Sequence, residues 1–261
     1  MTPESVALGD IATYLDHLLA IRQITDYPPA LNGVQVEHRG PVHRIAAAVD
    51  GSLRTIELAA AEGANLLLVH HGLFWNGLVP VTGAHHARLR ALFAHDMAVY
   101  SAHLPLDAHA TFGNSALLAK ALGLKATAGF ARHEQVDCGV RGDDALATDE
   151  LIARVRAWAT PLGHHTIASA VPAGHRTRRW AICTGAGAQA SNLREAYDTG
   201  IDTLIVGEGP HWSAVDAAER GLVIIYAGHY ATETLGVRAL AEHLGTKYAL
   251  PWTFVHAPTG L

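Results

Sequence analysis

Two adjacent histidines, His70 and His71, follow directly on the apolar run Leu66–Val69, which has the length and composition of a buried strand. Such a strand normally ends in a turn residue, because an imidazole is costly to desolvate unless its nitrogens find a partner. A metal ion is the simplest partner. Gly72 gives the backbone the freedom to aim both side chains at neighbouring positions. The pair alone is equally compatible with histidines that cap a loop, so the hypothesis depends on further ligands elsewhere.

A second candidate group begins with His103 and includes Asp107. It follows the apolar segment Met97–Ala102, and Pro105 stiffens the backbone between the two polar residues. Asp107 is a candidate metal ligand, although an aspartate at this position could also cap a helix or turn. His103 is a candidate ligand, a group that orients a ligand, or a substrate contact.

A third group, His229 and Glu233, follows the apolar run Leu222–Tyr226. The two residues are four positions apart at an expected helix start, so their side chains share one face of its first turn. A histidine and a carboxylate in that arrangement can bind the same metal site. The alternative is a helix cap at Thr232 or Thr234, with Glu233 merely favouring the positive end of the helix.

These groups together predict a site for two metal ions. A single catalytic zinc normally takes three protein ligands and a water, whereas five candidate ligands are present. With Glu233 as a bridge, two ions about 3.5–4 Å apart would hold a bridging hydroxide, and His103 or Glu208 would transfer a proton. The mixed nitrogen and oxygen donors suit Zn, Fe, Mn or Ni and argue against a calcium cage. The candidate metal ligands are His70, His71, Asp107, His229 and Glu233.

Alternating strands and helices predict an α/β fold whose two similar halves have mostly parallel sheets. Strands are expected at 44–49, 65–69, 97–102, 180–184, 203–206 and 222–226. Helices are expected at 8–19, 52–62, 85–95, 114–122, 148–158, 191–199, 211–220 and 231–243. The expected divisions are a first half at 1–125, a small inserted region at 126–177 and a second half at 178–261 that completes the metal site.

In parallel α/β sheets, ligand sites lie outside the carboxyl ends of the strands. Eight groups capable of chemistry fall at such positions in this sequence. They are His70, His71, His103, Asp107, Glu208, His211, His229 and Glu233.

Composition restricts the remaining function classes. The net charge of −5 gives no electrostatic footprint for nucleic-acid phosphates, so a nucleic-acid partner is not expected. No apolar run approaches the roughly 18 residues that span a bilayer, which predicts no membrane insertion. Two cysteines are too few for a disulfide framework, and residues 1–20 lack the succession of regions of a signal peptide. This pattern is typical of a cytoplasmic protein.

Gly185, Gly187 and Ala190 have the spacing of a dinucleotide-binding fingerprint, with Glu208 roughly where an acid could bind a ribose. An NAD- or FAD-dependent oxidoreductase is therefore an alternative. The same spacing arises by chance in sequences rich in glycine and alanine, and a plain strand-to-helix turn is the favoured explanation. Neither cysteine lies beside a base, and there is no G-x-S-x-G elbow, so covalent catalysis is not indicated.

Three segments, at 68–75, 103–109 and 228–233, resemble the successive signatures of the Nif-three-like dinuclear metal-centre proteins, also called the GTP cyclohydrolase 1 type 2 family. Segments 32–36, 183–187 and 207–208 are similar too, so the resemblance covers about residues 5–258. The chain departs from the family at Tyr230, where members often carry a second histidine, and at 209–212, where the run after Glu208 is usually more polar.

The resemblance implies a two-part α/β protein, commonly a ring-shaped homohexamer, whose ligands correspond to the five residues proposed above. It also implies a hydrolase that opens the imidazole ring of a purine nucleotide such as GTP. A phosphoester would suit the same two ions. The competing hypothesis is a ring scaffold without enzymatic activity that binds metal or partner proteins.

Overall fold

The computed structural model describes residues 5–261. Residues 1–4, which begin the segment inspected for a signal peptide, lie outside the described part. The chain divides into two compact units. Unit 1 comprises Met1–His109 and Gly236–Ala257, and unit 2 comprises Ala110–Leu235 and Pro258–Leu261.

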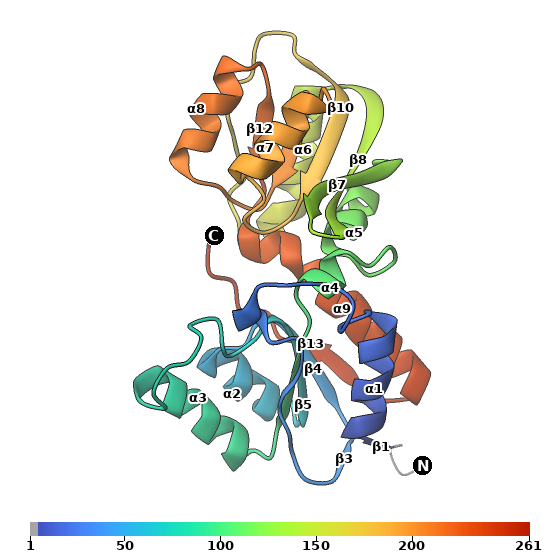
Figure 1. Cartoon of the computed structure of the whole chain (residues 1–261), viewed down its shortest axis with the longest axis vertical. Coiled ribbons are helices and arrows are strands. Elements are labelled where there is room, and N and C mark those ends of the chain that lie inside the picture. Colours follow the sequence, from blue (N-terminus) through green and yellow to red (C-terminus); the bar gives the residue numbers. More distant parts are fainter. Residues whose placement is uncertain (1–4) are drawn as a thin grey trace. The chain divides into compact units, whose positions relative to one another are not determined.

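Unit 1 is built on a five-stranded sheet of order β13-β4-β5-β6-β2. Strands β13, β4 and β5 of this sheet are labelled in Figure 1. The four strands from β13 to β6 are parallel to one another, and β2 is antiparallel to β6. A short antiparallel pair, β1 and β3, lies apart from this sheet. The strands are β1 (Val6–Ala7), β2 (Gly33–Val36), β3 (Pro41–Val42), β4 (Ile45–Asp50), β5 (Leu66–His71), β6 (Ala98–Ser101) and β13 (Trp252–Phe254). The helices are α1 (Leu8–Leu18), the 3-10 helix η1 (Pro28–Ala30), α2 (Leu53–Ala61), α3 (Gly83–Ala94), α4 (Leu104–Asp107) and most of α9 (His229–Tyr248).

Strand β5 is apolar on both faces because both faces of the unit 1 sheet are covered. Its residues Leu67 and Val69 pack in one cluster with Ile56 of α2 and Leu92 of α3. Its residues Leu66 and Leu68 point to the opposite face and are also fully buried. A parallel strand covered on both sides reads as a continuous hydrophobic run, and this is the pattern seen in the sequence.

The helix that follows β4 has a defined start. The Ser52 side chain accepts a hydrogen bond from the Thr55 N–H at 3.2 Å, and the Thr55 hydroxyl accepts one from the Ser52 N–H at 2.9 Å. This reciprocal capping box fixes α2 immediately after the strand, so only Gly51 and Ser52 link β4 to α2.

Unit 2 is built on a six-stranded sheet of order β7-β8-β10-β11-β12-β9. Its strands β10, β11 and β12 are parallel, and the pairings of β7, β8 and β9 are antiparallel. The strands are β7 (Ala128–His133), β8 (Val136–Ala147), β9 (Ile167–Ala168), β10 (Arg176–Cys183), β11 (Thr203–Val206) and β12 (Val223–Tyr226). The helices are α5 (Asn114–Ala121), α6 (Thr148–Ala159), the 3-10 helix η2 (Thr160–Leu162), α7 (Ala190–Asp198), α8 (His211–Glu219) and the first part of α9.

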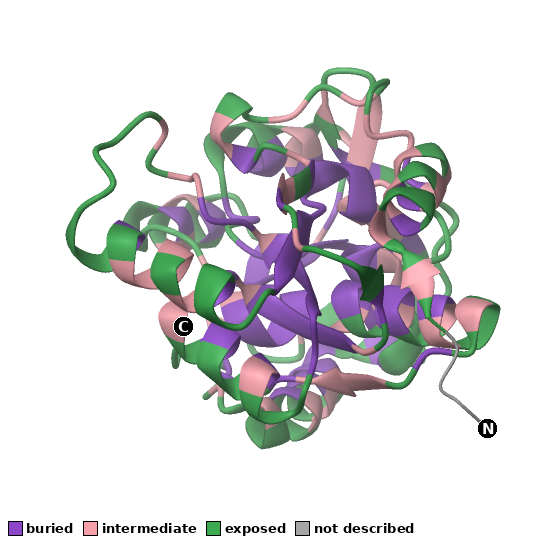
Figure 2. Ribbon diagram, turned by 90° about the horizontal axis from the view of Figure 1, so that it is seen from below, coloured by how far each residue is buried: buried purple, intermediate pink, exposed green. Residues whose placement is uncertain are grey.

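The unit 2 strands alternate between two buried clusters. Trp180 and Ile182 pack with residues of α5 and α6, whereas Ala181 and Cys183 pack with residues of α7 and α8. Figure 2 shows the same division between inside and outside, with buried strands and with exposed residues along the outer sides of the helices. The parallel strands of this sheet are therefore also covered on both faces.

The predicted α/β fold with two sheet-containing halves is confirmed, with differences in detail. The unit 2 sheet is mixed because segment 126–177 contributes the antiparallel strands β7, β8 and β9 rather than a separate structure. The compact units divide the chain at His109 and within α9, not at residues 125 and 177. Residues Gly236–Ala257, expected in the second half, belong to unit 1, where β13 pairs with β4. None of the helices in residues 5–261 has the length and hydropathy needed to cross a bilayer.

A chain of buried side-chain hydrogen bonds links three elements of unit 2. Thr148, Thr177 and Thr203 are fully buried, and neighbouring hydroxyls in this order are 2.9 Å apart. The Thr203 hydroxyl donates to the carboxylate of Asp202 at 2.9 Å, which fixes the direction of every bond in the chain. Thr177 then donates to Thr203, Thr148 donates to Thr177, and Nδ1–H of His175 donates to Thr148 at 2.8 Å.

Replacing the central threonine tests this chain. We expect Thr177→Val to lower the free energy of unfolding by roughly 1–3 kcal/mol, because the buried Thr148 hydroxyl loses its acceptor. Urea unfolding of Thr177→Val, with Thr177→Ser as the variant that keeps the hydroxyl, measures the effect. Thr199→Val is a matched control because its hydroxyl bonds only to carbonyls of its own helix. Equal stability of the two valine variants would contradict the prediction.

Candidate metal centre

The parallel strands of unit 1 end in polar residues at one edge of the sheet. Asp50 ends β4, His70 and His71 end β5, and His103 follows β6. In the β4–β5 ladder Asp50 and His71 are direct partners, so the register itself brings the carboxylate to the imidazole. This edge is where ligands bind in parallel α/β sheets.

Each of the three histidines at this edge is held by an oxygen atom at Nδ1. His71 Nδ1 lies 2.9 Å from Asp50 Oδ1, and His70 Nδ1 lies 2.9 Å from the carbonyl oxygen of Ala102. His103 Nδ1 lies 2.9 Å from Asp26 Oδ1. Carbonyl and carboxylate oxygens only accept hydrogen bonds, so Nδ1 carries the proton in each ring. In the neutral imidazole Nε2 then bears the lone pair, which is the state that binds a metal.

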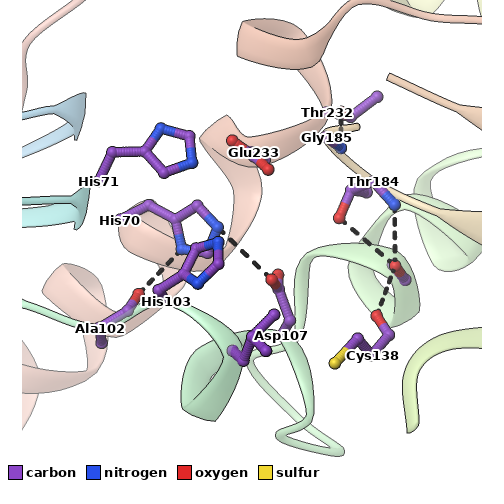
Figure 3. Close-up of polar contacts among 12 residues, drawn as sticks. His70, His71, Ala102, His103, Asp107, Cys138, Thr184, Gly185, Thr232 and Glu233 are labelled. Carbon is purple, nitrogen blue, oxygen red and sulfur yellow. Dashed lines mark hydrogen bonds and ion pairs between the residues drawn. The ribbon is translucent and has the colours of Figure 1, made fainter. Parts of the chain in front are cut away.

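The three rings form one cluster (Figure 3). Ring centroids are 4.8 Å apart for His70 and His71, 4.9 Å for His70 and His103, and 5.6 Å for His71 and His103. One nitrogen from each ring lies within 4.8 Å of the others, so the group could hold a metal ion. His70 is fully buried and His103 nearly so, which keeps bulk water from competing for these nitrogens.

Asp107, at the end of α4, adds a carboxylate to this cluster. Its Oδ2 lies 3.5 Å from His70 Nε2, and its side chain is 8% exposed. This distance exceeds that of a good N–H···O hydrogen bond. It is close to the separation expected for two ligands that each lie about 2.0–2.1 Å from a shared ion. Asp107 thus fits the role of a ligand better than that of a cap.

Asp26, in the loop before η1, fixes the position of His103. Its carboxylate accepts hydrogen bonds from the His103 ring, Asn32 Nδ2 and the backbone N–H groups of Tyr27 and Leu104. Burial alone would raise the pKa of Asp26, but the hydrogen bond and charge of His103, with the bonds from Asn32 and Tyr27, hold the pKa below its ordinary value of 3.8. Asp26 is therefore ionised throughout the physiological range.

Trp75 packs against two rings of the cluster. Its indole lies edge-on to His103 at a centroid distance of 4.8 Å and to His71 at 5.7 Å. The loop after β5 that carries Trp75 is anchored by Gln35, whose Oε1 accepts a hydrogen bond from the Leu73 N–H at 2.7 Å. Gly72 is required here because a Cβ would collide with the Gln35 side chain.

Unit 2 carries a second group of ligand type at the start of α9. His229 Nε2 lies 3.1 Å from Glu233 Oε2 across the first helical turn, and His229 Nδ1 lies 2.8 Å from Glu208 Oε1. Glu233 is 3% exposed. Burial by itself would lower the pKa of His229, but the charges and hydrogen bonds of Glu233 and Glu208 outweigh it and raise this pKa to about 9. The carboxylates that hold this ring therefore strongly favour a cation at the imidazole.

A turn between β10 and α7 makes room for Glu233. Gly185 has a φ of +62°, and a Cβ there would collide with Glu233 Oε1. The Gly185 N–H donates to the Thr232 hydroxyl at 3.1 Å, which ties the turn to α9 (Figure 3). Gly187 is equally constrained, because a Cβ would collide with the Cys183 carbonyl. The glycine spacing that resembles a dinucleotide fingerprint is thus explained by packing.

The structure places the predicted residues in two groups, each described within its own unit. His70, His71, His103 and Asp107 come together in unit 1, and Glu208, His229 and Glu233 come together in unit 2. His211 is exposed at the start of α8. The ligand and proton-transfer roles assigned from the sequence stay predictions.

Sequence reasoning missed Asp26, Asp50 and Trp75. Asp50 could have been found from its position at the end of an apolar run next to the predicted strand of His71. No comparable signal marks Asp26, because it lies in a loop far from His103 in the sequence. Trp75 had only its proximity to the histidine pair to mark it.

The fold and these groups define an α/β protein whose strand and helix ends gather imidazoles and carboxylates that could hold metal. The chain belongs to the Duf34/NIF3 (NGG1p interacting factor 3) family, which it matches over residues 6–259. It is 41% identical over 260 residues to a Deinococcus radiodurans protein named GTP cyclohydrolase 1 type 2 homolog, covering 98% of this chain and 95% of that protein. The family resemblance predicted from the sequence is confirmed.

Solved structures show the same fold. The protein ybgI, of unknown function, is 33% identical to this chain, with a TM-score of 0.88. The match covers 98% of this chain and 100% of ybgI. The protein TTHA1606 from Thermus thermophilus is 34% identical with a TM-score of 0.85, at the same coverage of 98% and 100%. The likeness therefore extends over both units.

Asp26 should stabilise unit 1 in a pH-dependent way. Its folded pKa lies below 3.8, so its contribution is present above the unfolded pKa and is lost as the pH falls through the folded pKa. We expect Asp26→Asn to be less stable than the wild type by roughly 1–3 kcal/mol near neutral pH, with the difference shrinking below about pH 4. Chemical unfolding across an acid pH series measures the stability difference and its pH dependence. Asp198→Asn, at an exposed position, is the control. A difference that stays constant down to about pH 3 would contradict this account.

Gly185→Ala should displace Glu233. The substitution adds the strain of a positive φ and a collision with the Glu233 carboxylate, so we expect lower metal content as well as lower stability. Gly221→Ala is the matched control, because Gly221 has a similar φ of +73° and open space around its Cβ position. Elemental analysis and thermal unfolding of both variants separate strain from collision. If both lose metal equally, the turn does not act through Glu233.

Proposed function

We propose that the protein is a dinuclear metal-dependent hydrolase whose ions would be held by His70, His71, Asp107, His229 and Glu233. One observation carries the proposal. His70, His71, His103 and His229 each have Nδ1 within 2.9 Å of an oxygen acceptor. Histidines that bind metals in proteins almost always donate Nδ1–H or Nε2–H to such an oxygen, which fixes the tautomer and orients the ring.

The donor set fits two divalent ions better than one. Unit 1 offers His70, His71 and Asp107, and unit 2 offers His229 and Glu233. Neither set alone provides ligands for two open metal sites, so we propose that all five residues would hold the ions. Imidazole and carboxylate donors suit Zn, Fe, Mn or Ni. In both sets a histidine Nε2 faces a carboxylate oxygen, at 3.5 Å in unit 1 and 3.1 Å in unit 2.

When bound, two divalent ions would supply Lewis acidity and lower the pKa of water enough for hydrolysis near neutral pH. The surrounding residues hold the ligands in place. Asp50 and the Ala102 carbonyl fix the unit 1 rings, and Glu208 fixes His229. Because Glu208 Oε1 is engaged by His229, we propose Glu208 as a positioning residue rather than a proton carrier.

His103 is the residue that we propose to move a proton. The Asp26 carboxylate holds Nδ1–H, so Nε2 can accept a proton while Asp26 stabilises the imidazolium that forms. The ring lies beside His70 and His71, and Trp75 packs on its side and restricts the approach of water from that direction. This geometry supports a general base and acid at the cluster.

The name of the Deinococcus radiodurans relative, GTP cyclohydrolase 1 type 2 homolog, supports hydrolysis of C–N bonds in a nucleotide as the reaction class. We propose this class for the present chain, with a phosphoester as the alternative substrate. The homohexamer implied by the family resemblance stays a prediction.

Metal content and hydrolysis test the proposal together. We expect about two ions per chain in protein purified without added metal, and clear loss of metal in His70→Ala and Glu233→Gln. His38→Ala is the control, since this half-buried histidine bonds to Asn65 and lies outside the cluster. His103→Ala should keep most of its metal but lose at least about a hundredfold in rate on any substrate found in a panel of GTP, other nucleotides and phosphoesters.

Two results would contradict the proposal. Undiminished metal in His70→Ala would refute the placement of the ions. Metal-loaded protein that hydrolyses no member of the panel would favour a metal-binding scaffold over an enzyme.

A further inference from the structure

We propose that a cavity beside His71 binds the oxyanion group, a carboxylate or phosphate, of a small ligand through Arg88 and Trp75. The proposal rests on the proposed function in that it places this group next to a metal ligand. The cavity has a volume of about 230 Å³ and lies entirely within unit 1. Its lining includes Asp50, Ser52, His71, Trp75, Asn76 and Arg88.

Arg88 is the main reason to expect an anion. It lies on α3 and is half-buried, and its Nε is buried with no hydrogen-bond partner in the described part of the chain. Within residues 5–261 it also forms no ion pair. A guanidinium has five N–H donors and no acceptor, and a buried donor without an acceptor is costly. A carboxylate or phosphate can accept two parallel hydrogen bonds from the planar N–H groups of a guanidinium.

Trp75 lines the same cavity and carries a second donor without an acceptor. Its Nε1–H is buried and likewise has no partner among the described residues. The indole N–H can only donate, so it too requires an acceptor. The ring cannot turn away freely, because its edges pack against His71 and His103. Trp75 and Arg88, which belong to different elements, thus both line the cavity, and each has a buried N–H without an acceptor among the described residues.

The charges around the cavity favour the same ligand. Asp50 lines it too, but Oδ1 of this carboxylate accepts from His71 and the side chain lies beyond ion-pair distance of Arg88. No carboxylate of the described residues lies within the 4.0 Å of an ion pair with Arg88. Ser52 marks the start of α2, a helix of nine residues whose N-terminal dipole adds to the positive potential.

Size and position limit what the ligand can be. The cavity is smaller than the roughly 300–1,000 Å³ of pockets that enclose whole small molecules. It therefore holds one end of a ligand, and a complete nucleoside triphosphate would not fit inside. His71 lines the cavity and also belongs to the histidine cluster, so the bound group would anchor a substrate whose reacting atoms lie at the cluster.

Titrations with inorganic phosphate and with acetate test the subsite on the protein as purified. We expect at least one anion to shift the NMR signals of Trp75 Nε1–H and Arg88 Nε–H, with the indole signal assigned by Trp75→Phe. Arg88→Gln should weaken binding by about tenfold or more, whereas Arg90→Gln, an exposed arginine on the same helix, should not. A response to phosphate alone identifies a phosphate-bearing ligand, and a response to acetate alone identifies a carboxylate.

Equal affinities in the two glutamine variants, or no shift of the Trp75 signal with either anion, would overturn the subsite. Metal analysis of the same samples distinguishes failure of the anion subsite from failure of the proposed metal centre. Normal metal without anion binding refutes only the subsite. Anion binding that depends on Arg88 in protein that binds no metal supports the subsite and refutes the metal centre.

Discussion

The orientation of four imidazole rings by oxygen acceptors is the constraint on which the candidate centre depends. A neutral histidine has one donor and one acceptor nitrogen, and its environment decides which is which. In this protein a backbone carbonyl or a carboxylate lies at Nδ1 of every ring in the two groups, at 2.8–2.9 Å. The protein thus supplies an oxygen acceptor at Nδ1 of each ring, and in unit 2 the other nitrogen of His229 faces Glu233 Oε2.

In unit 1 the sheet itself places two of the oxygen acceptors beside their histidines, because these acceptors lie at the ends of strands next to β5. Asp50 is the ladder partner of His71, and the Ala102 carbonyl follows the strand that pairs with β5. Burial of β5 on both faces holds its backbone rigid, so the ring positions follow from the sheet rather than from a flexible loop. Only His103 depends on a loop residue, Asp26, and four donors hold that residue in place.

Much of this could be predicted from sequence. The apolar runs of β4, β5, β6, β11 and β12 are buried on both faces and are therefore visible as runs, and the histidines at their ends are conspicuous. The edge strand β7 and its neighbour β8 have many exposed residues and carry charged ones such as Arg141, so they have no such signal. β13 is only three residues long and pairs with a strand some two hundred residues earlier. Asp26 was missed because loop packing, not spacing, brings it to His103. Asp50 does end an apolar run, but its pairing with His71 depends on the strand register.

Both units hold an imidazole against carboxylate oxygens, but they do so with different local structures. In unit 1 the sheet register sets the acceptor against the ring, whereas in unit 2 the first turn of α9 sets Glu233 against His229, and Glu208 after β11 holds the other nitrogen. Because Gly185 has no Cβ, the Glu233 carboxylate can pack against the turn between β10 and α7. The packing of unit 2 therefore fixes the position of the Glu233 carboxylate. A buried carboxylate and imidazole pair contributes little to stability compared with apolar residues of the same volume. Each unit therefore carries an imidazole and a carboxylate of the kind that could hold a metal ion.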